Sequence, residues 1–113
     1  MIPSLWAELN HFSPFEFEHP EEMEFNLMAQ LDVAREIAGI PFRINSSHRP
    51  GDLLSHGKGM AVDIECLTSR NRFHIVQALL MVGFTRIGVY DRHIHADIDP
   101  SLPQDVMWWG RSK

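Results

Sequence analysis

Two short stretches carry residues whose types and spacing suit metal chemistry. The first, 55–64, holds His56 and Asp63 with six residues between them, two of which are glycines. The second, 92–98, places a histidine or an aspartate at every second position: His93, His95 and Asp97. Imidazole and carboxylate groups are among the ligands that zinc takes in proteins. We interpret the two stretches together as a site for one zinc ion.

The elements that must position these side chains are two strands. Residues 61–66 alternate with period two, which directs Asp63 and Glu65 away from the face that carries the apolar residues. Residues 93–98 alternate in the same way and place His93, His95 and Asp97 on one face. Adjacent strands lie about 4.8 Å apart, so side chains on one sheet face can converge on a single ion.

Catalytic zinc usually has three protein ligands and keeps a fourth position for water. His56, Asp63 and His95 form such a set, with two ligands around one strand entry and the third on a distant strand. Zinc lowers the pKa of a bound water to about 7 and polarises a carbonyl oxygen. The pattern therefore favours a zinc-dependent hydrolase.

Three further residues have predicted roles around the ion. His93 lies one pleat from His95, and we expect it to orient or deprotonate the water and to protonate a leaving amine. Asp97 could bond to a ligand imidazole and hold it in place. Arg49 precedes the ligand loop, where its guanidinium suits a substrate carboxylate or the oxyanion of a tetrahedral intermediate.

Two other interpretations of the same residues stay open. The histidines could pair with carboxylates on a polar sheet face without any metal. Alternatively, the ion could be a closed structural zinc, a kind of site that favours four Cys or His ligands. The chain has one cysteine, which makes the closed site less favourable. The same count excludes an intramolecular disulfide, and we expect Cys66 to be a small buried strand residue.

The periodicity predicts one domain over 1–113 with an α+β fold. Helical spacing covers 20–38, with Gly39 as the stop, and about 70–82, with Thr68 or Ser69 as the cap. Strand patterns cover 41–47, 61–66, 84–90 and 93–98. We expect helices to cover a small antiparallel sheet of about four strands. Trp108 and Trp109 in the tail either close over the core or edge a groove, and we favour packing.

Composition limits the partners of the chain. A formal charge of −5 over 113 residues argues against a broad nucleic-acid surface. The longest apolar run, 78–82, is too short for membrane insertion, and no basic leader with an apolar signal core precedes the domain. We expect a monomer that is made in the cytoplasm and, if it acts elsewhere, is released by other means.

Three segments form a combined signature: Ser46-Ser47-His48-Arg49-Pro50, the stretch 55–64 and His93-Ile94-His95-Ala96-Asp97. They resemble the zinc D-Ala-D-Ala carboxypeptidase family, which includes D,D-carboxypeptidases, D,D-dipeptidases and bacteriophage endolysins of the lysostaphin and hedgehog superfamily. The likeness extends to residues 11–17 and to the helix that leads to Gly39, and so covers nearly the whole chain.

The resemblance implies a hedgehog/D,D-peptidase-like fold and a function for each matching residue. His56, Asp63 and His95 match the zinc ligands, His93 the catalytic histidine and Arg49 an arginine near the substrate. His48 stands where the family often has an aromatic residue. We expect His48 and Ser55 to lie at the substrate or behind the ligands.

The implied activity is a metallopeptidase that cleaves peptidoglycan stem peptides or D-Ala-D-Ala peptides. The compact chain without a leader is similar to an endolysin or a virion-associated wall hydrolase of a bacteriophage, which acts on the cell wall after release. Two alternatives remain: a cytoplasmic D-Ala-D-Ala dipeptidase or carboxypeptidase, and a non-catalytic, metal-containing binding or virion component.

Overall fold

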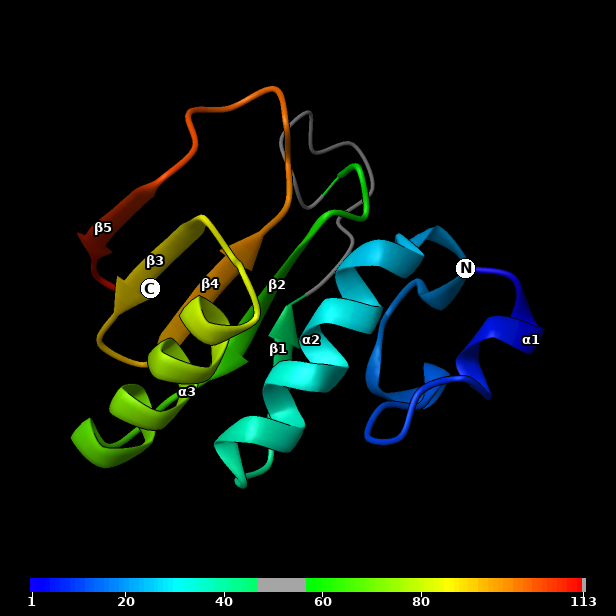
Figure 1. Ribbon diagram of the computed structural model, residues 1–113, viewed down its shortest axis with the longest axis horizontal. Coiled ribbons are helices and arrows are strands. Elements are labelled where there is room, and N and C mark those ends of the chain that lie inside the picture. The colour runs from blue at the N-terminus through cyan, green and yellow to red at the C-terminus, as the bar shows by residue number, and fades with distance from the viewer. Residues whose placement is uncertain (47–56, 113) are drawn as a thin grey trace.

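The computed structural model describes residues 1–46 and 57–112 and contains one five-stranded sheet with the strand order β1-β2-β4-β3-β5 (Figure 1). Its strands are β1 (Ile44–Ser46), β2 (Ala61–Glu65), β3 (Arg86–Tyr90), β4 (His93–Asp97) and β5 (Val106–Gly110). The first four pair in antiparallel fashion, as the sequence predicts. The fifth strand was not predicted, and it runs parallel to β3. The α+β class is therefore confirmed, with a mixed sheet.

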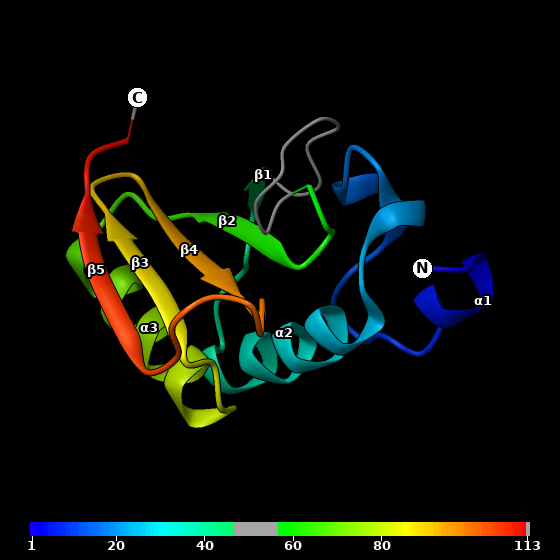
Figure 2. The same cartoon turned by 90° about the horizontal axis from the view of Figure 1, so that it is seen from above.

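Two long helices cover the same face of the sheet, α2 (Phe25–Ala38) and α3 (Ser69–Met81) (Figure 2). Helix α3 begins where predicted, because the hydroxyl of its N-cap Thr68 accepts the N–H of Asn71 at 3.1 Å. Helix α2 ends where predicted, at Gly39 in the left-handed region with φ 69°.

The start of α2 differs from the prediction. Residues 20–38 have continuous helical spacing, but the structure forms a single 3₁₀ turn, η2 (Pro20–Glu22), and then two extended residues before α2. Tertiary bonds hold this segment: the Gly59 carbonyl accepts the N–H of Glu24 at 3.0 Å, and the N-terminal ammonium donates to three carbonyls within 20–23. A tertiary contact thus overrides the local helical preference. Further short helices, α1 (Pro3–Trp6) and η1 (Pro14–Glu16), lie at the end of the molecule remote from β5 (Figure 1).

The two faces of the sheet differ in chemistry. Side chains on the helix face are almost wholly buried and form the core with α2 and α3; they include Val62, Ile64, Ile87, Val89, Ile94 and Ala96. Cys66 belongs to the same core, as predicted, and burial raises the pKa of its thiol. The opposite face carries Asp63, His93, His95 and Asp97. Strand alternation thus places the apolar core residues on one face and the histidines and aspartates on the other.

No helix in the described part of the chain is long and apolar enough to cross a membrane.

Gly59 and Gly39 offer a matched test of this packing. Both have a positive φ, 71° and 69°, but a Cβ at Gly59 would lie 1.9 Å from the Glu22 carbonyl oxygen whereas a Cβ at Gly39 meets nothing within 4 Å. We expect Gly39→Ala to cost about 1 kcal/mol, the price of the left-handed backbone alone. Gly59→Ala should cost about 2 kcal/mol more because the backbone must move. Urea unfolding measures both, and equal losses would contradict the contact.

Candidate metal centre

Strands β2 and β4 bring together two of the three predicted zinc ligands. Asp63 and His95 are direct partners in the antiparallel register, and both side chains lie on the open face of the sheet. His95 Nδ1 is 3.2 Å from Asp63 Oδ1. Two donor atoms at zinc bond lengths and a tetrahedral angle lie about 3.3 Å apart. The separation of this pair is that of a direct hydrogen bond, and it also matches the distance between two ligands of one zinc ion.

His95 is held from behind by a buried carboxylate. Its Nε2 lies 2.7 Å from Oδ2 of Asp97, a residue only 1% exposed. The other carboxylate oxygen of Asp97 accepts Arg86 Nε–H at 2.8 Å and the Asp99 N–H at 3.1 Å. A carboxylate on the second nitrogen of an imidazole fixes the ring and leaves the first nitrogen to face a metal.

The charges of this group reinforce one another. Burial by itself lowers the pKa of His95, but hydrogen bonds and charge from Asp63 and Asp97 outweigh it, so the pKa is raised. Burial in turn raises the pKa of Asp97, and the bonds from His95, the Asp99 N–H and Arg86 outweigh that effect, so its pKa is lowered. Asp97 is thus held as a carboxylate, a charged partner for the His95 ring.

His93 lies beside the pair with its ring fixed on two sides. Its Nδ1 is 2.7 Å from the Ser112 hydroxyl oxygen, and the ring stacks on Tyr90 with centroids 4.3 Å apart and an angle of 11° between planes. Its Nε2 is 3.9 Å from Asp63 Oδ1. His93 therefore presents Nε2 toward the candidate metal centre, and Nδ1 is committed to the serine.

Trp108 forms a wall next to His95, with ring centroids 5.4 Å apart. The indole lies directly over Gly88, where an added Cβ would be 2.6 Å from its Nε1. That nitrogen donates to the Tyr90 hydroxyl at 3.0 Å, and the Arg86 guanidinium lies 5.1 Å from the ring centroid on the indole face. The absence of a side chain at Gly88 leaves room for the indole, whose plane is tilted by 49° to the His95 ring.

Asp99 joins the end of β4 to the chain just before β2. It is 1% exposed and accepts a bond from Lys58 Nζ at 3.1 Å, while Ser101 donates its hydroxyl to the other carboxylate oxygen at 2.6 Å. Lys58 follows residue 57, where the described structure resumes. This ion pair holds Lys58, three residues before β2, against the segment that follows β4.

Four predicted site residues, His48, Arg49, Ser55 and His56, lie outside the described residues. Within 1–46 and 57–112, no three His, Cys, Asp or Glu side chains form a group that could hold a metal ion. The structure therefore brings together Asp63 and His95, with His93 and Asp97 around them. The third predicted ligand, His56, stays a prediction.

Sequence reasoning did not identify four residues that shape this centre: Arg86, Tyr90, Trp108 and Ser112. Trp108 was assigned to packing, because the strand that carries it was not predicted. Arg86 gave a usable signal: it shares a strand face with Gly88 and Tyr90 in an otherwise apolar strand. A cation at such a position usually has a buried carboxylate partner.

No protein-family model, curated protein or solved structure matches this chain.

The Arg86–Asp97 pair should contribute strongly to stability. Arg86→Met leaves the buried Asp97 carboxylate without its guanidinium, and we expect a loss of about 3 kcal/mol in the free energy of unfolding. Arg43 is the control, since its side chain is 79% exposed and 3.8 Å from Glu65. Arg43→Met should change stability by less than about 0.5 kcal/mol. Urea titration measures the free energy of unfolding of both variants. Similar losses in the two would argue against a special role for Arg86.

Proposed function

We propose that this chain is a zinc-dependent metallopeptidase that hydrolyses peptide bonds of bacterial peptidoglycan. The observation that carries the proposal is the pair of Asp63 Oδ1 and His95 Nδ1 at 3.2 Å on adjacent strands, with Asp97 behind the histidine. The choice of peptidoglycan rests on the sequence resemblance alone.

The donor set fits zinc. Two imidazoles and one carboxylate are typical ligands of catalytic zinc, and they leave one position open. Asp63 and His95 would supply two of the ligands, and His56 would supply the third by its match to the family. Asp97 is the carboxylate partner that metal-bound histidines usually have on their second nitrogen.

Bound zinc would activate a water and polarise the scissile carbonyl. The residues of the chain then handle protons and charge. His93 would take a proton from the water at Nε2 and deliver it to the leaving amine, because its Nδ1 is engaged by Ser112. The bonds from His95, the Asp99 N–H and Arg86 hold Asp97 as a carboxylate, and Asp97 in turn would keep the proton of His95 on Nε2.

Aromatic residues and predicted polar residues would together contact the substrate. Tyr90 and Trp108 form an aromatic wall beside the two histidines, which would shield the reacting groups from bulk water. Arg49 would bind a substrate carboxylate or the oxyanion, and His48 and Ser55 would lie nearby. These last three roles come from the sequence.

Metal content tests the ligand set. We expect one zinc per chain by elemental analysis after dialysis, and almost none for Asp63→Asn. Asp97→Asn should retain the ligands but weaken zinc affinity by roughly 10- to 100-fold. The control is Asp32→Asn, which changes another buried aspartate that bonds to backbone N–H groups on the far side of the molecule. Loss of zinc in the Asp32 variant, or its retention in the Asp63 variant, would contradict the site.

Hydrolysis tests the role of His93. We expect His93→Ala to keep its zinc and to lose at least about 100-fold in kcat, the contribution of a positioned general base. His74→Ala, on helix α3, should leave the rate unchanged. Release of muropeptides from intact sacculi and of D-alanine from D-Ala-D-Ala peptides should be measured in parallel by mass spectrometry. Activity on the free dipeptide alone favours the cytoplasmic dipeptidase, and no hydrolysis by zinc-loaded wild type favours the binding component.

A further inference from the structure

Strand β5 forms one edge of the sheet, and its backbone is arranged to accept another strand. Val106 donates its N–H to the Thr85 carbonyl at 3.0 Å, so Val106, Trp108 and Gly110 direct their backbone groups toward β3. Met107 and Trp109 then direct theirs outward. In the described part of the chain, β3 is the one strand that pairs with β5. An edge of this kind is a template for further pairing.

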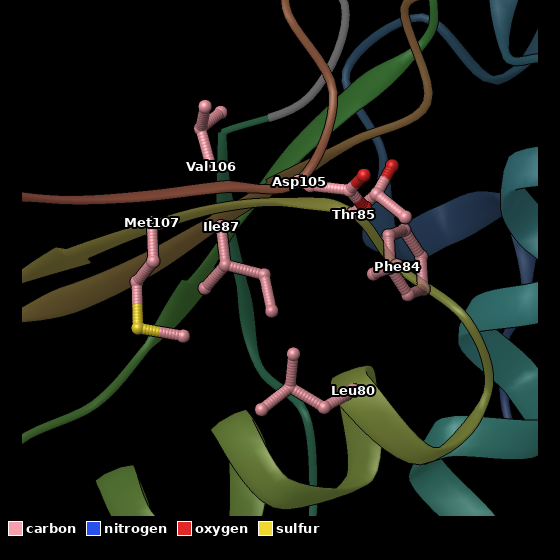
Figure 3. Close-up of a pocket in the computed structure, with 7 residues that line it drawn as sticks. All are labelled: Leu80, Phe84, Thr85, Ile87, Asp105, Val106 and Met107. Carbon is pink, nitrogen blue, oxygen red and sulfur yellow. The ribbon is translucent and has the colours of Figure 1, made fainter.

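The helix side of this edge is apolar and exposed. Met107 and Trp109 lie opposite Ile87 and Val89 in the register and so point to the helix face, with 43% and 78% of their surface exposed. A pocket of about 280 Å³ lies next to Met107, between the end of α3 at Leu80 and Ile87 (Figure 3). Side chains of this kind rarely gather on a surface that has no partner.

The two ends of β5 carry opposite charges, so two antiparallel copies of the strand would bring opposite charges together at each end. Asp105 comes directly before the strand and Arg111 directly after it, and both are exposed. In an antiparallel pairing of two identical strands centred on Trp108, each Asp105 comes at the same end as the Arg111 of the other copy, both one residue beyond β5. The same register sets Met107 opposite Trp109, the two residues whose backbone groups point outward. A shift of the register by two residues loses the Asp105–Arg111 contacts.

We propose that β5 pairs in antiparallel fashion with β5 of a second copy of this chain, forming a dimer with one ten-stranded sheet. The twofold axis passes beside Trp108, as an isologous interface requires. Trp109 of each copy then lies beside Met107 of the other, at the mouth of the pocket that Leu80 and Ile87 line. The proposal departs from the monomer expected from the sequence.

The interface is small, since each copy contributes one five-residue strand and the side chains around it. Interfaces at the lower end of the size range form reversible complexes. We therefore expect a dimer whose population depends on concentration in the micromolar range.

Sedimentation velocity of the full chain over a concentration series tests the pairing. Wild type should shift from monomer to dimer, and Trp109→Lys should stay monomeric over the same range. The matched control is Phe15→Lys, because Phe15 is 96% exposed and lies in η1, at the opposite end of the molecule. It should dimerise like wild type. Wild type that is monomeric throughout, or Trp109→Lys that still dimerises, would overturn the proposal.

A charge exchange tests the register. Arg111→Glu alone and Asp105→Lys alone each place like charges opposite one another twice in the dimer and should be mainly monomeric. In an equimolar mixture both flanking pairs are again opposite in charge, and a heterodimer should form. Circular dichroism establishes that each variant is folded before mixing. A mixture of folded variants that remains monomeric excludes this pairing.

Discussion

The candidate metal centre depends on one buried ion pair. Arg86 on β3 and Asp97 on β4 meet on the open face of the sheet, with Arg86 Nε 2.8 Å from Asp97 Oδ1. The other oxygen of Asp97 contacts His95 and so restricts the position of its ring. A charged side chain is costly to bury unless it is paired and fully bonded, so this arrangement tolerates little displacement. Because the pair joins two neighbouring strands, the orientation of His95 is set by the pairing of the sheet itself.

The fold follows from the sequence where local signals agree with tertiary packing. Period-two alternation around Asp63 and His95 predicted their shared face, since a strand that buries one face must expose the other. Thr68 and Gly39 marked helix ends for reasons of backbone bonding that need no tertiary contact. These features are local, and a single sequence carries them.

Other features could not be predicted because they depend on distant parts of the chain. Residues 20–24 have helical spacing, but the contact with Gly59 prevents a helix there. Strand β5 has Met107, Trp108 and Trp109 in succession, which conceals the alternation that marks a half-buried strand. The aromatic wall is similarly hidden, because it depends on the absence of a side chain at Gly88 and Gly110 beneath Trp108 and Tyr90.

Ser112 links the end of β5 to His93. The residue follows β5, and its hydroxyl contacts His93 Nδ1 while its N–H bonds to Asp91 in the turn between β3 and β4. The end of β5 is thereby fastened to the imidazole that would move protons. A shift of this strand along its axis would disturb the position of that ring, so the edge strand is mechanically linked to the candidate metal centre.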